Sequence, residues 1–225
     1  MMEPYDKCVN LMRTFFRVKG FMEIHSQCLS ILACEDPSNI ITYEYANQVY
    51  MLPQTNQLSL DNEILKNKEH IPGYFCVTTK YYNETIGGMY PQFEFECKGG
   101  IDVLIPLQDE LFQFMGFHLK DIEDCEETPF HPIPFWTTKG KNLYKKVNNI
   151  EIICSSEKCC NKLDMRNRFD NLYEGTYADI LYNTFGKERV EKELTTFLKH
   201  TFIHRSCGSI GIIQMIQAMK QSNLM

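Results

Sequence analysis

Residues 74–96 constrain the fold of this chain more than any other stretch, because they are typical of a β-hairpin with two different faces. The first arm, 74–82, is rich in aromatic and β-branched residues, and two glycines at 87–88 supply the tight connection. The second arm, 92–96, alternates strictly as Gln-Phe-Glu-Phe-Glu. The pattern predicts aromatic side chains packed on a core and polar side chains opposite them. That polar face is either the floor of a site or a solvated surface.

Composition limits the classes of protein to consider. A chain of 225 residues with 44% hydrophobic residues suits a single domain with a full core. Its formal net charge of −6 argues against a large nucleic-acid footprint, which needs clustered lysine and arginine. The 10 cysteines contain no Cys-x-x-Cys pair. No stretch approaches the roughly 20 apolar residues of a membrane span, and no apolar run follows the first residues. We therefore expect a cytoplasmic protein with reduced thiols and no membrane association.

Two blocks of the hairpin resemble motif 2 of the class II aminoacyl-tRNA synthetases. The blocks are residues 81–84 (Tyr-Tyr-Asn-Glu) and 90–96 (Tyr-Pro-Gln-Phe-Glu-Phe-Glu). The version they resemble belongs to the asparaginyl-tRNA synthetase and asparagine synthetase A (aspartate–ammonia ligase) group, which writes the first block as Tyr-Arg-Asn-Glu. In that family the arginine grips the α-phosphate of ATP, and here Tyr82 takes its place.

The same resemblance implies a set of nucleotide-binding candidates on the hairpin. Glu84 and Tyr90 keep the family's residue types. Lys80 precedes Tyr82 by two residues, so the alternation of a strand puts both on one face. The Lys80 ammonium is a point charge, and it lies two residues before the position of the family arginine. It is therefore a poor replacement for a bidentate guanidinium.

Segments before and after the hairpin resemble the other two class II motifs. Residues 11–27 read as helix, glycine and strand, like motif 1, which implies a homodimer or heterodimer; Gln27 stands where the family has proline. Residues 201–221 resemble motif 3, with Gly-Ser-Ile-Gly leading into a helix. Gly211 is a nucleotide-binding candidate there, and Gln214 replaces the arginine that contacts the γ-phosphate in the family.

Further site candidates follow from the family pattern. Glu151 matches the carboxylate that helps hold Mg²⁺ and the ATP phosphates, and Lys158 replaces an arginine. The residues that would line the amino-acid pocket are Gln54, Thr55, Gln57, Glu94, Glu96, Ser155 and Lys158. From the residues alone, positions 54–57 read equally well as a capped helix start, with Thr55 or Asn56 as N-cap and inward-facing leucines behind it. Glu84 and Glu96 could also do no more than pair with the nearby Lys80 and Lys98.

The remaining segments follow from periodicity. The expected elements are a helix over 1–19, a strand over 21–25, a loop-like stretch over 33–50 with a short strand over 47–52, a helix over 107–117 preceded by 101–104, a solvated acidic surface over 121–127, a buried strand within 148–161 and a helix over 183–200. Phe135 and Trp136 resemble a family segment that packs near the site.

Taken together, the resemblance implies an α+β fold, the class II synthetase core, with a mainly antiparallel β-sheet flanked by α-helices. Residues 1–225 would form one such domain without an anticodon-binding domain, which makes tRNA an improbable partner. Removing one preorganised donor from such a site costs about 10²–10³ in rate, and this chain lacks two. Three functions stay open: a pseudoenzyme with a binding or regulatory role, an active ATP- and Mg²⁺-dependent ligase that forms an aspartyl adenylate, or an interaction protein with a vestigial pocket.

Overall fold

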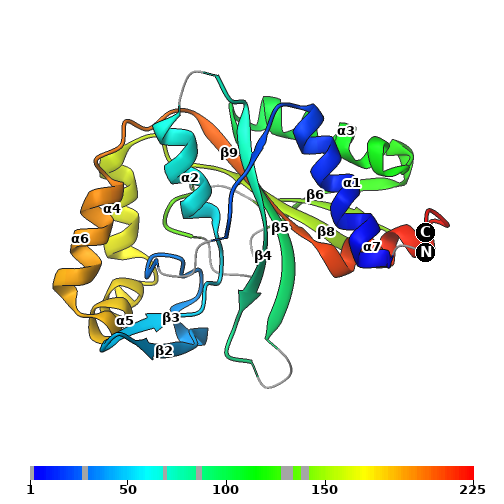
Figure 1. Cartoon of the computed structure of the whole chain (residues 1–225). Coiled ribbons are helices and arrows are strands. Elements are labelled where there is room, and N and C mark those ends of the chain that lie inside the picture. Colours follow the sequence, from blue (N-terminus) through cyan, green and yellow to red (C-terminus); the bar gives the residue numbers. More distant parts are fainter. Residues whose placement is uncertain (1–2, 27–29, 68–69, 85–87, 128–133, 138–141) are drawn as a thin grey trace.

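A seven-stranded sheet forms the centre of the molecule (Figure 1). The computed structural model of the chain describes residues 3–26, 30–67, 70–84, 88–127, 134–137 and 142–225. The strand order is β1-β4-β5-β9-β8-β7-β6, in which β1 runs parallel to β4 and every other described pair is antiparallel. The strands are β1 (Met22–Glu23), β4 (Gly73–Tyr81), β5 (Met89–Lys98), β6 (Ile122–Glu127), β7 (Asn142–Val147), β8 (Ile150–Glu157) and β9 (Arg205–Gly211).

Helices cover both faces of this sheet, each over its own apolar cluster. Figure 1 shows α1, α3 and α7 gathered on one side, and α2, α4, α5 and α6 on the other together with a small sheet, β2 (Thr42–Tyr45) and β3 (Gln48–Met51). The helices are α1 (Pro4–Val18), α2 (Gln57–Lys66), α3 (Ile101–Met115), α4 (Lys162–Asn171), α5 (Thr176–Phe185), α6 (Lys187–Phe197) and α7 (Ile212–Gln221), and two short 3-10 helices are η1 (Pro37–Asn39) and η2 (Leu119–Asp121). The expected α+β architecture is confirmed.

The aromatic side of the central hairpin packs on α1. Phe16 of that helix is fully buried, and its ring centroid lies 5.0 Å from that of Phe93 and 4.9 Å from that of Phe95. Phe75 of β4 stacks on Phe93 at 5.1 Å. The alternation predicted over 92–96 is therefore observed, since these rings point to one face and the glutamates between them to the other. This packing fixes which side of β5 faces the polar clusters described below.

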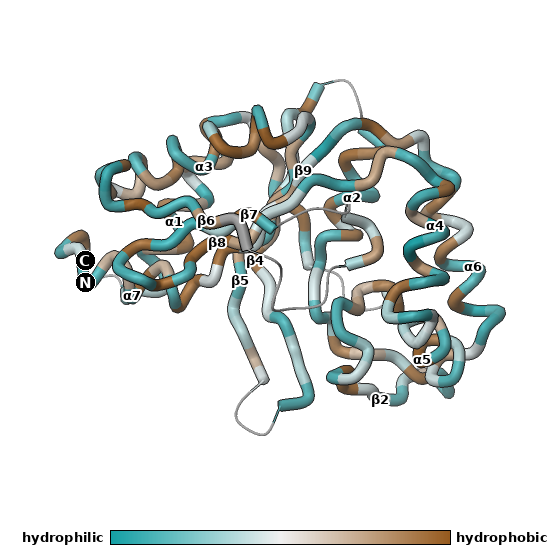
Figure 2. The backbone as a smooth tube through the Cα atoms, turned by 180° about the vertical axis from the view of Figure 1, so that it is seen from behind, coloured by the Kyte–Doolittle hydropathy of each residue, from teal (hydrophilic) through white to brown (hydrophobic). Residues whose placement is uncertain are grey.

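The hairpin of β4 and β5 projects beyond the body of the molecule (Figure 2). Gly88 closes it, because the backbone N–H of Tyr82 donates to the Gly88 carbonyl at 2.8 Å. A Cβ atom at Gly88 would lie 1.8 Å from the Tyr82 carbonyl oxygen, so only glycine allows this approach. The expected partner glycine, Gly87, lies outside the described residues.

Several local expectations need correction. Residues 101–104 are the first turn of α3, which begins after Gly100 and continues through Pro106 instead of starting behind it. The stretch 33–50 contains β2 and part of β3, joined by Ala46 and Asn47, both with positive φ (50° and 58°). That pair makes the two-residue hairpin connection that usually carries glycine, so composition did not indicate it.

Two more segments differ from the sequence-based expectation. The helix expected over 183–200 is divided at Gly186, whose φ of 85° ends α5 and precedes α6. The acidic stretch 121–127 is exposed at Asp121, Glu123 and Asp124, as expected, but most of it is a strand: it forms the edge strand β6, in which Glu123 pairs with Lys146 and Asp124 with Lys145 across to β7. Side chains of opposite charge that lie directly across from one another stabilise the pairing of β6 with β7.

Candidate functional site

The polar face of the central hairpin holds a cation that is already paired. The Lys80 Nζ lies 3.0 Å and 3.1 Å from the two carboxylate oxygens of Glu35, and 3.4 Å from Glu94 Oε1. The Tyr82 hydroxyl donates to the same Glu35 carboxylate at 2.6 Å. Lys80 and Tyr82 thus share a strand face as predicted, and both point at a carboxylate that comes from a different part of the chain.

The backbone around Glu35 is held by a single amide side chain. Gln54 accepts hydrogen bonds from the backbone N–H groups of Glu35 and Asp36, each at 2.7 Å, and donates to the Asp36 carbonyl at 2.8 Å. Its own backbone N–H donates to the Ala33 carbonyl at 3.0 Å. We call residues 30–36 the strap. Gln54 is fully buried and fixes the strap, so it does not line an open pocket.

The protonation states of this cluster follow from burial and charge. Burial lowers the pKa of Lys80, but the neighbouring carboxylates, Glu35 first and then Glu94, outweigh that effect, and the net pKa lies well above the ordinary value. Burial and the Glu35 charge raise the pKa of Tyr82, which keeps its hydroxyl protonated as a donor. Burial also raises the pKa of Glu94, while Lys80 opposes the rise.

Glu94 ties the hairpin to the start of α2. It accepts from the Thr55 hydroxyl at 2.8 Å and from the backbone N–H of Asn56 at 2.6 Å. Thr55 in turn accepts from the backbone N–H of Gln57 at 3.1 Å, so its side chain satisfies a free donor of the first helical turn. Asn56 occupies the N-cap position of α2 without a side-chain capping bond. The helix-start interpretation of 54–57 is therefore observed, with Thr55 supplying the bond.

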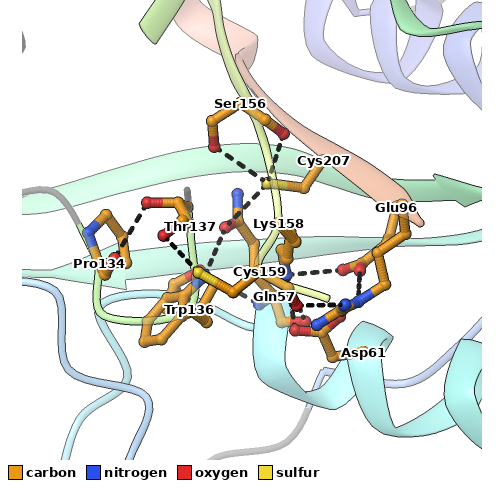
Figure 3. A network of polar contacts seen from close by, with 12 residues as sticks. Gln57, Asp61, Glu96, Pro134, Trp136, Thr137, Ser156, Lys158, Cys159 and Cys207 are labelled. Atoms are coloured by element: carbon orange, nitrogen blue, oxygen red, sulfur yellow. Dashed lines mark hydrogen bonds and ion pairs between the residues drawn. The ribbon is translucent and has the colours of Figure 1, made fainter. Parts of the chain in front are cut away.

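A second cluster is completely buried between α2, β5, β9 and the end of β8 (Figure 3). Lys158 Nζ lies 2.8 Å from Asp61 Oδ2 and 2.7 Å from Glu96 Oε2. Arg205 Nε pairs with Asp61 and lies 3.0 Å from Glu96 Oε1. We call these four residues the ion cluster. Two cations and two carboxylates balance, so the cluster is neutral as a whole.

The two carboxyls of the ion cluster have opposite pKa shifts. Burial and the nearby Asp61 charge hold the pKa of Glu96 well above its ordinary value. Burial also penalises the charged form of Asp61, but Arg205 and Lys158 outweigh it and lower its pKa. Paired cations thus keep Asp61 ionised, and Glu96 is the group that takes up a proton first.

Aromatic and thiol groups seal the other side of the ion cluster. Trp136 is fully buried, with its ring 5.9 Å from Lys158 Nζ, and its indole N–H donates to Gln57 Oε1 at 3.2 Å. The Cys207 thiol donates to the same Gln57 oxygen at 3.4 Å. Burial raises the pKa of Cys207 to about 11, so it is a protonated donor at neutral pH. The expectation that 135–136 pack near the site is met by these contacts.

Two predicted residues take no part in either polar cluster. Ser155 is on the opposite sheet face, in step with the buried Ile153, and its hydroxyl donates to the Leu143 carbonyl at 3.2 Å. Strand alternation excludes it from the face that carries Lys158, which is three positions further. Glu151 follows a β-bulge between β7 and β8 and is exposed on the same sheet face as Tyr144, on whose phenol its charge acts. It belongs to neither polar cluster.

The remaining nucleotide-binding candidates are spread over the hairpin and β9. Glu84 is exposed and accepts a hydrogen bond from the Tyr90 hydroxyl. Gly211 is buried at the start of α7, opposite Gln92 of β5. The Gln214 amide folds back on it, since a Cβ at Gly211 would lie 2.2 Å from Gln214 Oε1. The structure therefore joins the candidates into two pairs, Glu84 with Tyr90 and Gly211 with Gln214.

Sequence reasoning missed the partners of both polar clusters. Glu35 lies in a stretch that reads as a loop, Asp61 as an ordinary polar residue of a helix, and Arg205 as the start of a strand. All three contact residues far away in the sequence, and each has at least one candidate among its partners: Lys80 for Glu35, Lys158 for Asp61 and Glu96 for Arg205. The available signal was Lys158, because a lysine between an expected buried strand and a Cys-Cys pair needs a counter-charge if it is buried.

Two hollows of the described surface differ in their relation to these clusters. One is lined by residues of the strap, α2 and α6, and the other by β4 residues on both sides of Lys80, by residues 52–53 and by Tyr5 and Ser26. No residue predicted for the amino-acid pocket lines either of them. Among the described residues, no group of three or more His, Cys, Asp and Glu side chains is placed to hold a metal ion. No helix of the described chain has the length and apolarity needed to cross a membrane.

Comparison with known proteins shows the fold. Sequence comparison with family models and with curated proteins gives no match. Among solved structures, the asparaginyl-tRNA synthetase of Pyrococcus horikoshii with asparaginyl-adenylate superposes with a TM-score of 0.76 at 11% identity, over 97% of this chain and 64% of that one. The Entamoeba histolytica asparaginyl-tRNA synthetase with asparaginyl-adenylate gives 0.70 at 13% identity, over 98% and 63%. The chain thus has the class II synthetase fold and spans just under two thirds of these solved chains.

Proposed function

We propose that this class II synthetase-like protein forms no aminoacyl adenylate and serves as a binding or regulatory subunit. Its asparaginyl-tRNA synthetase-like fold supports the comparison of sites. The observation that carries the proposal is the position of Glu35. An internal carboxylate faces Tyr82, where the family places the arginine for the α-phosphate, and it also pairs with the neighbouring Lys80.

The charges of this cluster disfavour a nucleotide triphosphate. Lys80 faces two carboxylates, Glu35 and Glu94, so one positive and two negative charges leave a net −1. A phosphate entering beside them would face uncompensated negative charge. At about 4 Å and an effective dielectric constant near 20, each such charge pair is worth about 4 kcal/mol. ATP binding would require the strap to move and Lys80 to be released from Glu35.

The residues predicted for the amino-acid pocket are also engaged in contacts within the protein. Gln54, Thr55, Glu94, Glu96 and Lys158 are at most 1% exposed and bind one another, α2 or the strap. A substrate would have to displace these contacts, and breaking one partner of a buried ion pair costs about 3–5 kcal/mol. The exposed Glu151 is the only metal candidate that the resemblance supplies, and neither polar cluster includes it. The residues present therefore do not fit ATP and Mg²⁺.

Calorimetric titration tests the proposal directly. The purified chain would be titrated with ATP·Mg²⁺ and with a non-hydrolysable aspartyl-adenylate analogue, followed by aspartate-dependent pyrophosphate exchange. We expect neither binding nor exchange. Micromolar binding of either ligand together with exchange would refute the proposal and establish the active ligase instead.

A reconstructed variant supplies the matched comparison. The combination E35Q, Y82R and Q214R removes the internal carboxylate charge and restores both family arginines. We expect it to bind ATP·Mg²⁺ measurably more tightly than the wild type, whereas the exposed E44Q should not. Equal affinity of the two variants for ATP·Mg²⁺ would mean that the Glu35 carboxylate is not what prevents ATP binding at this face of the hairpin.

We also propose that the protein dimerises through the motif 1-like region, although residue 27 lies outside the described residues. Support comes from exposed apolar side chains at the end of α1 and on β1: Val18 is 78% exposed and Met22 is 51% exposed. β1 is also an edge strand of the sheet, and among the described residues no strand lies beyond it. Light scattering should give a dimer at micromolar concentration, and M22K should shift it towards monomer; a monomeric wild type would refute this.

A further inference from the structure

A cavity of about 320 Å³ opens between the strap, α2 and α6. The Lys80 and ion clusters contribute no residue to its lining. It is therefore separate from the face on which the family resemblance places its site residues. A volume of this size lies at the lower end of small-molecule sites.

The floor of the cavity is apolar. Leu32 of the strap, Leu58 of α2 and Phe197 of α6 line it, and each is at most 5% exposed. They belong to the apolar cluster beneath α4, α5 and α6, so the floor is rigidly packed. A ligand with a compact apolar body would bury surface here at about 25 cal/mol per Å².

Charged residues at the rim come from a single face of α6. Residues 189, 192, 193, 196 and 197 all line the cavity, and their spacing of three and one is that of one helical face. Arg189 is fixed there, since it donates to the Val49 carbonyl and its guanidinium carbon lies 4.4 Å from the centre of the Tyr50 ring. Lys192 is exposed beside it.

The carboxylate of the rim is hydrogen-bonded to the strap. Glu193 accepts from the Ser30 hydroxyl and from the backbone N–H groups of Ile31 and Leu32, the latter two at 3.4 Å. Glu193 thus anchors the strap. The charged residues among the described lining residues are two cations, Arg189 and Lys192, and one carboxylate, Glu193. The described rim carries a net charge of +1, in a protein whose total is −6.

We propose that this cavity binds a compact monocarboxylate, with its apolar body on the Leu32, Leu58 and Phe197 floor and its carboxylate between Arg189 and Lys192. Guanidinium and ammonium groups both form charge-assisted hydrogen bonds with carboxylates. The apolar floor selects against free inorganic anions, and the net positive rim selects against amines. The chemistry is shared by short fatty acids and aryl acids, and the test distinguishes them.

The test uses octanoate and phenylacetate as probes, with octanol and octylamine as neutral and cationic comparisons. Binding to the full chain would be followed by calorimetry and by chemical-shift changes of α6 amides. We expect saturable binding of at least one carboxylate, at least tenfold tighter than that of octanol, and none of octylamine. Tighter binding of octanoate than of phenylacetate would show that the natural ligand has an aliphatic body. Tighter binding of phenylacetate would show that its body is aromatic. Absence of saturable binding of both carboxylates overturns the proposal.

Matched variants on α6 locate the site. T196F should block the cavity mouth and abolish binding, whereas T195F, at an exposed position that does not line the cavity, should leave the dissociation constant unchanged. K192Q should weaken carboxylate binding by about two- to fivefold, as for an exposed ion pair, with K187Q as its control. Equal binding by T196F and T195F would place the carboxylate elsewhere and refute the proposal.

Discussion

Replacing Lys158 with methionine should strongly destabilise the protein. Lys158 is completely buried and lies within 2.8 Å of both Asp61 and Glu96. Methionine retains most of the volume but removes the charge, which leaves Arg205 alone against two buried carboxylates. Breaking a buried ion pair in this way costs about 3–5 kcal/mol. For a chain of this length that corresponds to a fall in Tm of about 6–20 °C.

Urea denaturation followed by far-UV circular dichroism at pH 7 measures the loss, with the exposed K199M as control. Because total stability is typically about 5–15 kcal/mol, a second variant keeps the test informative if K158M does not fold. Adding E96Q to K158M removes the carboxylate whose pKa is raised and returns the cluster to neutrality. We expect the double variant to recover about 1–3 kcal/mol relative to K158M. A loss below about 1 kcal/mol in K158M, or no recovery, would refute the electrostatic argument.

The same variant has a predictable pH dependence. The folded pKa of Glu96 already lies above its unfolded value, and losing the neighbouring cation raises it further. A carboxyl with a raised folded pKa stabilises the fold at low pH and loses that contribution as pH rises through the folded pKa. The deficit of K158M should therefore be smaller at pH 5 than at pH 8. A deficit that grows on acidification would contradict the assignment of the proton to Glu96.

Three further predictions concern single positions. G208A should lower the free energy of unfolding by about 1–3 kcal/mol, because a Cβ at Gly208 would lie 2.5 Å from an aromatic ring of β5. The control is G211A, since a Cβ at Gly211 would meet a flexible side chain, that of Gln214. Equal urea midpoints for the two variants would contradict this. Y82F should cost about 1 kcal/mol through the lost hydrogen bond to Glu35, and a wild-type midpoint would show that bond to be unimportant. Trp136, the one tryptophan, should emit at short wavelength and resist acrylamide until the chain unfolds; quenching of the native state as efficient as that of the unfolded chain would contradict its burial.

The sequence predicted the architecture because its periodicity and motif order agree. Phe93 and Phe95 alternate with glutamates, so the hairpin and its two faces follow from that alternation alone. The N-terminal helix was equally accessible, from apolar residues at helical spacing that are buried around Phe16 and its neighbours. Local patterns fail at boundaries: the helix expected from residue 107 begins directly after Gly100 and runs through Pro106.

The state of the site could not be predicted in the same way. The sequence indicated that Glu94, Glu96 and Lys158 lie near one another, since the family resemblance supplied their places. It did not indicate that Asp61 and Arg205 complete a neutral cluster, because no local pattern specifies contacts between residues 144 positions apart. Nor did it indicate that Glu35 reaches Lys80, since a loop carries no periodicity to orient its side chains.

The clamp by which Gln54 holds the strap has a consequence for any substitution at position 82. An arginine placed there would meet the Glu35 carboxylate and form an internal pair. Its guanidinium would then be occupied by the protein itself and not by a ligand. A cation at this position becomes available to a ligand only when the strap changes as well, so the two segments have to be redesigned together.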